Sequence, residues 1–284
     1  NLVTMLQRSP TYFVSRPDED RVALFLKKFL PKSLVYALIR FKNVYIQQSL
    51  FKRVRAFPDR SKKFLIDQVK KELPDFDVDK HFTPSYNPWE QRMCLIPNSD
   101  FFNAIKDKSA TVVTDHIEAF EENGIKLKSG DFLEADIIVT ATGLVLQNFG
   151  GVNISVNNNP VNVSETMTYK SLMYSDIPNF VNSFGYINAS WTLKADLTST
   201  YLCRLIKHMD QNNYLSACPK KPLDVDETYD WLKDFSSGYI QRSIGLHPQQ
   251  GSKKPWVNYQ DYIKDWFDVK FSKLEDGNLV FSKD

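Results

Sequence analysis

The stretch from Asp136 to Gly143, with the sequence Asp-Ile-Ile-Val-Thr-Ala-Thr-Gly, constrains the fold of this chain more than any other. A carboxylate opens it, four consecutive β-branched residues follow, and a small residue and a glycine close it. Short apolar runs of this kind are typical of strands that are buried on both faces. Gly143 has no Cβ, so the backbone there can take a positive φ and approach another group closely. The stretch therefore predicts a core strand that ends in a turn.

A strand is also predicted from Leu2 to Leu6, and it ends in the polar, cationic turn Gln7-Arg8-Ser9-Pro10. In nucleotide-binding β-α-β units, the residue after the second strand meets the adenosine ribose. An acid at this place suits NAD, whereas an Arg accommodates the additional 2′-phosphate of NADP. Arg8, with the Ser9 hydroxyl beside it, fits the second case. The alternative is a merely solvated Arg, which is the commoner situation after a strand.

Helices are predicted from about Asp18 to Leu73, because apolar residues recur there at three- and four-residue spacing. Two such series are Leu34, Leu38, Phe41, Tyr45 and Leu65, Val69, Leu73. Between Lys27 and Lys71 the sequence holds thirteen Lys or Arg and only two Asp or Glu, although the net charge of the whole chain is +2. Such an excess usually marks a solvated helical face. The alternative is a basic amphipathic surface that touches an anionic membrane or gathers an anionic cofactor.

Two later segments have the composition of a site wall. The segment from Tyr86 to Pro97 is predicted to be irregular and is rich in aromatic, amide and cationic groups. The segment from Ile177 to Trp191 predicts a strand, a turn and then a helix with an apolar stripe at Leu193, Leu197, Tyr201 and Leu205. The free N–H groups at such a helix start favour an anionic ring edge. A capped core helix with Trp191 as packing is an equally good interpretation. Further helices are predicted at 224–235 and 259–267.

The composition argues against several classes of protein. The three cysteines lie far apart without a Cys-x-x-Cys pair, and the four histidines show no ligand spacing. Neither a disulfide framework nor a metal site is therefore expected, and a reducing cytoplasm fits best. A net charge of +2 gives no support to nucleic-acid binding. No secretory signal and no run that could span a bilayer is found.

Three stretches together resemble the class B flavoprotein monooxygenases, the family of the Baeyer–Villiger monooxygenases. The segment from Gln7 to Thr11 resembles their NADPH-binding segment. The stretch from Asp136 to Gly143 resembles the place where their chain passes between two dinucleotide-binding domains. The segment from Tyr86 to Phe101 is similar to the one that carries the active-site arginine in the ethionamide-activating and long-chain alkane branch. The resemblance extends over nearly the whole chain.

The resemblance implies an α/β fold with two Rossmann-like dinucleotide-binding domains. Residues 1–135 would be the rear part of the NADPH-binding domain, with a helical insertion at about 18–73. Residues 136–284 would return to the FAD-binding domain and add C-terminal helices. No Gly-x-Gly pair occurs among the ten glycines, although each such domain should carry a Gly-x-Gly-x-x-Gly fingerprint. The chain is therefore expected to be an N-terminally truncated, C-terminal fragment.

By the same resemblance, FAD and NADPH are the cofactors and Arg92 is the catalytic residue. A guanidinium stays protonated and donates in a planar fork, so Arg92 could stabilise a C4a-peroxyflavin anion and then a substrate alkoxide. Gln7, Arg8 and Ser9 would contact NADPH. The residues expected near the flavin are Ala141, Thr142, Gly143, Asn188, Ser190 and Trp191.

The predicted activity is oxygen insertion next to a ketone carbonyl, or oxygen transfer to sulfur or a long aliphatic substrate, with NADPH and O2 consumed. In the family that the chain resembles, an acidic residue of the FAD-binding domain holds the arginine that corresponds to Arg92. A fragment that lacks this acid and the fingerprints should neither hold FAD tightly nor turn over. Two alternatives stay open. One is a flavin monooxygenase that oxidises only nitrogen or sulfur. The other is a non-catalytic module attached to the inner face of the membrane through basic helices at 27–71.

Overall fold

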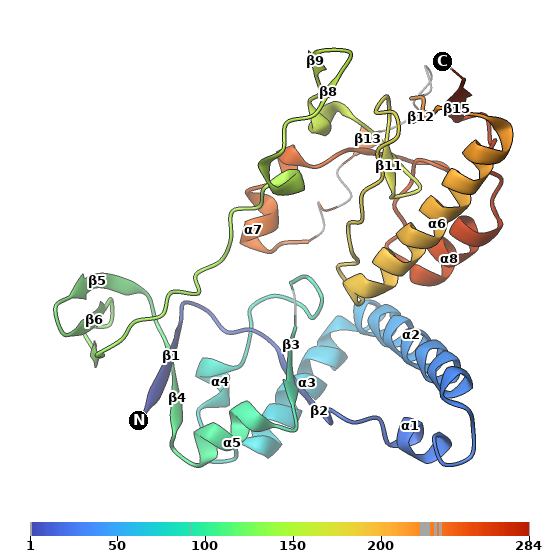
Figure 1. Ribbon diagram of the computed structural model, residues 1–284. Helices are drawn as coiled ribbons and strands as arrows, with labels where there is room; N and C mark the ends of the chain where they lie inside the picture. The colour runs from blue at the N-terminus through green and yellow to red at the C-terminus, as the bar shows by residue number, and fades with distance from the viewer. Residues whose placement is uncertain (1, 92, 222–227, 230–231, 233–234, 284) are drawn as a thin grey trace. The chain divides into compact units, whose positions relative to one another are not determined.

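The computed structural model describes residues 2–91, 93–221, 228–229, 232 and 235–283 (Figure 1). The chain forms two compact units, Asn1–Gly143 and Leu144–Asp284. The sequence predicts a domain boundary after residue 135, and the boundary between the units lies eight residues later. Assigning the units to an NADPH-binding and an FAD-binding domain stays a prediction.

The strands of the first unit form small sheets. β1 (Val3–Gln7) pairs in parallel with β4 (Ala110–Thr114), which confirms the strand predicted at 2–6. β2 (Phe13–Arg16) pairs in parallel with β3 (Cys94–Pro97). An antiparallel sheet follows, made of β5 (Ile117–Glu121), β6 (Gly124–Leu127) and β7 (Phe132–Glu134). Parallel pairing requires long crossover connections, and the helices between β1 and β4 supply them.

The helices predicted between residues 18 and 73 are confirmed. They are α1 (Arg21–Leu26), α2 (Lys32–Ala56) and α3 (Pro58–Glu72), followed by the shorter α4 (Val78–His81) and α5 (Asp100–Lys106). Asp20 caps α1, because its carboxylate accepts the backbone N–H groups of Val22 and Ala23. Pro58 begins α3, where its missing N–H costs nothing.

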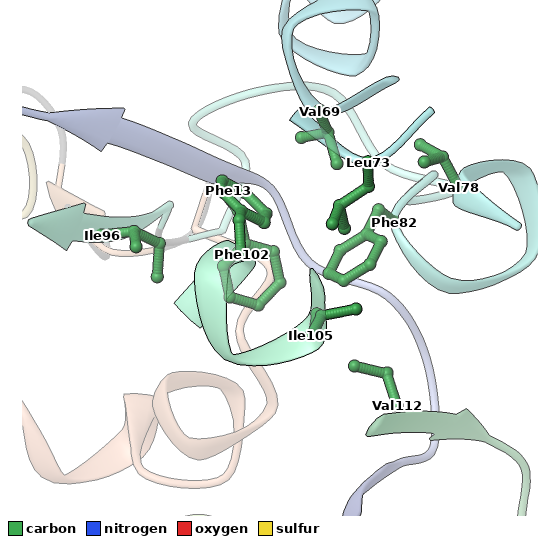
Figure 2. Packing of buried hydrophobic residues seen from close by; sticks show 9 residues of the cluster. All are labelled: Phe13, Val69, Leu73, Val78, Phe82, Ile96, Phe102, Ile105 and Val112. Atoms are coloured by element: carbon green, nitrogen blue, oxygen red, sulfur yellow. The ribbon is translucent and has the colours of Figure 1, made fainter. Parts of the chain in front are cut away.

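The core of the first unit joins α3, α4 and α5 to the parallel strands (Figure 2). Its centre is aromatic: the Phe13 ring meets Phe82 edge-on at 5.3 Å and stacks on Phe101 at 5.4 Å. The buried members are Phe13, Val69, Leu73, Val78, Phe82, Ile96, Phe102, Ile105 and Val112. One of the two predicted helical series thus reaches the core through Val69 and Leu73, whereas the series on α2 faces solvent.

The prediction of a core strand from Asp136 to Gly143 is wrong. These residues have no regular structure, and Ile137 and Val139 are 82% and 84% exposed. A strand buried on both faces needs paired neighbours and a covering layer, and no described strand pairs with this stretch. Gly143 nevertheless takes the positive φ that was expected, +107°.

The second unit is built around two helices, α6 (Trp191–Asn212) and α8 (Tyr262–Phe271), which pack against each other. The stripe predicted on α6 is confirmed, because Leu197, Tyr201 and Leu205 are buried. The helix predicted at 259–267 is confirmed as α8. The strand predicted at the start of the 177–191 segment is wrong, since that part is irregular.

Short strands and one short helix complete the second unit. They are β8 (Ser155–Val156), β9 (Asn159–Pro160), β10 (Thr168–Tyr169), β11 (Met173–Tyr174), β12 (Ser216–Pro219), β13 (Thr228–Tyr229), α7 (Gly238–Gln241), β14 (Gln250–Gly251) and β15 (Leu279–Ser282). The prediction of a helix at 224–235 is wrong at residues 228–229, because these form β13, which pairs with β14. Most of its other residues lie outside the described part of the chain.

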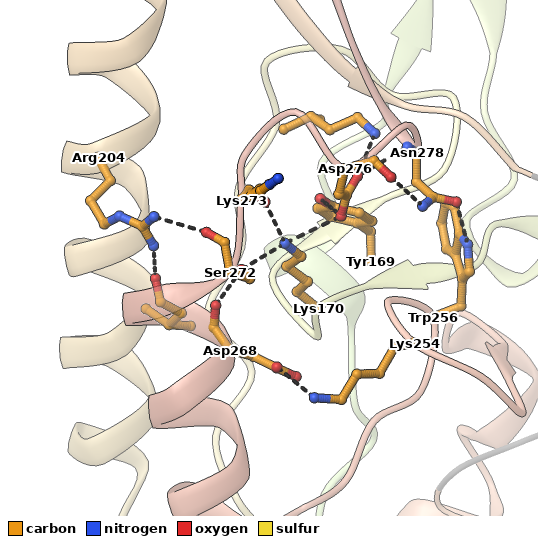
Figure 3. Close-up of polar contacts among 12 residues, drawn as sticks. Tyr169, Lys170, Arg204, Lys254, Trp256, Asp268, Ser272, Lys273, Asp276 and Asn278 are labelled. Atoms are coloured by element: carbon orange, nitrogen blue, oxygen red, sulfur yellow. Dashed lines mark hydrogen bonds and ion pairs between the residues drawn. The ribbon is translucent and has the colours of Figure 1, made fainter.

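A polar network ties the C-terminal end of α8 to β10 and α6 (Figure 3). The Tyr169 hydroxyl donates to the Asp276 carboxylate at 2.8 Å, and the buried Lys170 ammonium donates to the Ser272 hydroxyl at 2.9 Å. Arg204 on α6 donates to the carbonyl of Ser272 at 3.0 Å. Burial lowers the pKa of Lys170, and the Asp276 carboxylate opposes that shift. These bonds hold α6, whose first residue Trp191 lines the candidate site, to the segment that follows α8.

Candidate functional site

The second unit contains a cavity of about 220 Å³ that combines aromatic walls with a few polar groups. Pockets of this kind are the usual sites for small organic ligands. The aromatic lining consists of Phe149, Tyr174, Phe184, Trp191 and His247, and the polar lining includes Gln147, Thr168, Ser171, Asn182 and Asn258. We take this cavity as the candidate site of the second unit.

The rings of the cavity wall contact one another. Phe184 lies 5.1 Å from Trp191 and 5.6 Å from His247, measured between ring centres, and it meets the histidine edge-on. His247 is buried, and its Nε2 lies 3.5 Å from the Ser243 hydroxyl oxygen. Contacts between aromatic rings in these geometries are favourable beyond the area they bury, so they fix the shape of the wall.

Gly185 is a residue that the sequence analysis did not single out. A Cβ at this position would lie 2.1 Å from Cγ of the Trp191 indole, far inside van der Waals contact. Only glycine therefore lets the indole rest directly on the backbone of the turn. The sequence signal that could have identified this position is a glycine next to an aromatic residue at a predicted turn.

Replacing Gly185 with alanine is expected to push the Trp191 indole out of the cavity wall. The added methyl group must displace the ring, since the backbone below it cannot move as easily. The near-ultraviolet circular dichroism and tryptophan fluorescence of the chain should change. Gly245→Ala is the matched control, because a Cβ there meets nothing within 4 Å. Equal spectra for both variants would contradict this account of Gly185.

The three residues predicted in the turn have different environments. Trp191 begins α6 and lines the cavity. Ser190 is exposed, and its hydroxyl lies 2.7 Å from that of Thr192. Asn188 is buried, and its amide donates to the carbonyl of Gln260 at 2.9 Å. Asn188 therefore holds the turn in place, and Trp191 is the one of the three that reaches the cavity.

A buried ion pair supports the same turn. Lys194 on α6 and the Tyr186 hydroxyl both donate to Oδ2 of Asp265 on α8, each at 2.7 Å. All three side chains are buried. Burial lowers the pKa of Lys194 and raises that of Tyr186, and the nearby carboxylate raises both. The sequence analysis missed these residues, although Lys194 shares the helical spacing of Leu197 and Tyr201.

In the first unit, the residues predicted to bind NADPH lie at the end of β1 and directly after it. The Gln7 amide donates to the backbone oxygen of His81 at 2.7 Å and to the Thr114 hydroxyl at 2.9 Å. Gln7 therefore joins the ends of β1, β4 and α4. Arg8 and Ser9 are exposed in the turn after β1. A cationic turn at the carboxyl end of a parallel strand is the arrangement that nucleotide-binding units use.

The neighbouring His81 should make stability depend on pH. Burial lowers its pKa below the ordinary 6.5, and Lys80 adds to the shift, so the unfolded chain binds the proton more readily. The stabilisation is therefore present above about pH 6.5 and is lost as the pH falls through that value toward the lower pKa of the folded form. Urea unfolding between about pH 5.5 and 7.5 measures this. His81→Asn should flatten the slope and the exposed His116→Asn should not; an unchanged slope in His81→Asn would refute the assignment.

The loop that leads to Arg92 is held at several points. The Tyr12 hydroxyl donates to the carbonyl of Tyr86 at 2.6 Å. The Glu90 carboxylate accepts the backbone N–H of Asn87 at 2.8 Å and its amide N–H at 2.9 Å. The backbone hydrogen bond is the main reason why the pKa of Glu90 is lowered. Arg92 itself lies outside the described residues, so its catalytic role stays a prediction.

The remaining predicted residues, Ala141, Thr142 and Gly143, are exposed in the irregular end of the first unit. Their contact with a flavin stays a prediction. Within the described ranges, no group of three or more His, Cys, Asp or Glu side chains could hold a metal ion. Among the described helices, none is long and apolar enough to cross a membrane.

Solved structures define the class of protein to which this fold corresponds. An oxidised steroid monooxygenase bound to NADP superposes with a TM-score of 0.66 at 17% identity, over 100% of this chain and 62% of that chain. Cyclohexanone monooxygenase from Rhodococcus sp. Phi1 bound to NADP+ gives a TM-score of 0.61 at 12% identity, over 100% and 63%. The fold is therefore that of the Rossmann-like flavin monooxygenases, as the sequence predicted.

Sequence comparison identifies closer relatives within that class. The FAD-containing monooxygenase EthA of Mycobacterium tuberculosis is 46% identical over 283 residues, which cover 99% of this chain and 58% of the relative. The probable FAD-binding monooxygenase AlmA of Acinetobacter baylyi is 41% identical, over 99% and 56%. No protein-family model matches the chain. The chain is thus a homologue of the FAD-containing monooxygenases, which confirms the predicted resemblance, and it spans less than two thirds of their length.

Proposed function

We propose that the whole protein is an FAD- and NADPH-dependent monooxygenase that inserts oxygen beside a ketone carbonyl or transfers it to sulfur or to a long aliphatic substrate. The observation that carries this proposal is 41–46% identity to FAD-containing monooxygenases over 99% of the chain. The cavity of the second unit supports it, because its aromatic walls and amide edges suit a planar heteroaromatic ring or a substrate beside one.

The residues present fit the two cofactors. Arg8 at the end of β1 would hold the 2′-phosphate of NADPH, with Ser9 donating beside it. Trp191, with Phe184 behind it, would form an apolar wall near FAD, which when bound and reduced supplies the chemistry that activates O2. Arg92 would donate hydrogen bonds to the negative charge that develops on oxygen at the substrate carbonyl.

Purified full-length protein tests the proposal most directly. We expect a flavin absorbance spectrum, bleaching by NADPH without oxygen, and substrate-dependent NADPH oxidation with one oxygen atom in the product. The chain 1–284 alone should be colourless and should not oxidise NADPH. A full-length protein without flavin would overturn the proposal, and a flavin protein that forms only hydrogen peroxide with every ketone and sulfide would indicate an oxidase.

Ser171 gives a reason to expect an oxygen-bearing substrate in the cavity. Its side chain is buried and lines the cavity, and its hydroxyl has no hydrogen-bond partner among the described residues. A buried polar group left unpaired costs about 1–3 kcal/mol, so binding of a carbonyl oxygen would be favoured if the Ser171 side chain rotates and donates to it. A thioether offers only a weak acceptor at the same place.

Ser171→Ala in the full-length enzyme should therefore raise KM for a ketone. The lost hydrogen bond is worth about 0.5–1.5 kcal/mol, which corresponds to roughly a two- to tenfold change. Steady-state kinetics with a methyl ketone and a methyl thioether of equal chain length measures this, and KM for the thioether should stay unchanged. Equal effects on both substrates would assign Ser171 to packing.

Two narrower proposals complete this account. If the protein oxidises only nitrogen or sulfur, its activity will not depend on the arginine, and the Arg92 variant described in the Discussion separates the two cases. We also propose that this protein is cytoplasmic and attaches peripherally to the membrane through its basic helical region at 27–71. That region carries the large excess of Lys and Arg.

A further inference from the structure

The first two helices carry apolar side chains that the first unit does not bury. They recur at helical spacing through α1, the turn after it, and the first half of α2. We call them the aromatic face; its members and their exposed fractions are Phe25 60%, Phe29 71%, Leu34 45%, Leu38 45%, Phe41 70% and Tyr45 58%. Single exposed apolar residues are common, but six at regular spacing on two adjoining helices indicate a binding surface.

The residues of the aromatic face on α2 differ from the residues through which this helix packs on the protein. The buried residues of α2 are Val35, Val44, Gln48 and Val54, and none of them belongs to the aromatic face. The exposed rings are arranged in pairs: Phe25 and Phe29 lie 5.3 Å apart, and Phe41 stacks parallel to Tyr45 at 6.4 Å. The aromatic face therefore has a use for a partner that the described residues of the first unit do not supply.

The charge around the aromatic face is positive throughout. From Arg21 to Pro58 the sequence contains nine Lys or Arg and no Asp or Glu. The acid just before this range, Asp20, caps α1 and forms an ion pair with Lys42, so its charge is already compensated. Lys27, Lys28 and Lys32 are exposed at the junction of the two helices.

The neighbouring helix α3 differs from this surface. Lys63 forms an ion pair with Asp67 at 2.9 Å, and Lys70 pairs with Asp79 at 2.8 Å. The basic character of α3 is thus partly neutralised by acids of the same unit. The structure narrows the basic region of the sequence to α1 and the first half of α2, where cationic and apolar groups occur together.

We infer that α1 and the first half of α2 form a docking surface for an anionic lipid bilayer. Aromatic side chains enter the boundary between headgroups and acyl chains, while the lysines beside them extend to lipid phosphates. Each Lys or Arg near an anionic surface adds about fivefold in affinity. A second copy of the chain fits poorly, because pairing these faces would bring together two copies of a segment, residues 21–45, that contains six Lys or Arg and no Asp or Glu. This inference rests on the proposed peripheral attachment, assigns it to α1 and the first half of α2, and does not require monooxygenase activity.

Vesicle flotation of the full-length protein tests the inference. Binding is expected to vesicles of equal parts phosphatidylcholine and phosphatidylglycerol, to weaken at high salt, and to be absent with phosphatidylcholine alone. The charge reversal Lys27→Glu/Lys28→Glu/Lys32→Glu should reduce binding at least a hundredfold. Its matched control is Lys80→Glu/Lys108→Glu/Lys128→Glu, which makes the same change of net charge at exposed lysines elsewhere on the first unit.

The apolar contribution is tested separately with Phe25→Ser/Phe29→Ser. This variant should lose the part of vesicle binding that resists high salt. Phe120→Ser, at a residue that is also 60% exposed, should keep that part. Circular dichroism checks that each variant stays folded. Three results would overturn the inference: no dependence on anionic lipid, equal losses in both lysine triples, or binding by the chain 1–284 that the full-length protein lacks. The last would show that another part of the protein covers the aromatic face.

Discussion

Asp265→Ala is expected to lower the free energy of unfolding of the second unit by about 3–5 kcal/mol. Asp265 accepts from both the Lys194 ammonium and the Tyr186 hydroxyl, at 2.7 Å each, and all three side chains are buried. Removing the carboxylate leaves a buried cation and a buried hydroxyl without their acceptor. The cost of such an uncompensated charge exceeds that of most core truncations.

Urea unfolding of the chain 1–284, followed by near-ultraviolet circular dichroism, measures this loss. Lys194→Met/Asp265→Leu should recover most of the stability, because it removes both charges and fills the space with apolar groups. Lys63→Ala is the control, since its pair with Asp67 is exposed and should contribute little to stability. A loss below about 1 kcal/mol in Asp265→Ala would show that Lys194 finds another partner or becomes neutral.

The wrong prediction at Asp136–Gly143 shows what a local pattern leaves out. The β-branched run correctly marks residues that favour a buried strand. Whether they form one depends on neighbouring strands that pair with them, and no described strand does so. Gly143 was predictable, because a positive φ is a local property of its own backbone.

The helices were predicted well because their apolar spacing repeats over many residues. The spacing shows which residues share a face of the helix, but it does not show whether that face packs in the core or lies in solvent. Val69 on α3 is buried in the core, whereas Phe41 on α2, from an equally regular series, is 70% exposed. Only the packing of the folded unit separates a core face from a docking face.

The candidate site was predictable where one residue carries the signal. Trp191 at a helix start was identified, and it lines the cavity. The contacts that position it were missed, because they join distant parts of the chain. Lys194 meets Asp265 across 71 residues, and Asn188 meets Gln260 across 72. A buried lysine also contradicts the usual preference of that residue for the surface.

Arg92→Ala in the full-length enzyme is expected to lower kcat for a ketone by about 10²–10³-fold, equivalent to roughly 2.7–4 kcal/mol of barrier, which is typical when an oxyanion-hole donor is removed. Oxygen transfer to a thioether creates no alkoxide on the substrate, so sulfoxidation should lose far less. The difference arises because the guanidinium acts on charge that appears only during attack on a carbonyl.

The ratio of ketone to thioether turnover in one enzyme preparation measures this effect and corrects for lost protein or cofactor. Arg92→Lys should fall between the wild type and Arg92→Ala, because an ammonium keeps the charge without the planar fork. Arg8→Ala is the control: it should raise KM for NADPH and leave the ratio unchanged, since a 2′-phosphate contact lies away from the carbonyl. An Arg92→Ala enzyme that keeps its ketone activity would remove Arg92 from the mechanism and favour the flavin monooxygenases that oxidise only nitrogen or sulfur. A parallel loss of both activities would make the arginine a residue that holds cofactor or loop in place, because only a donor aimed at the carbonyl oxygen separates the two substrates.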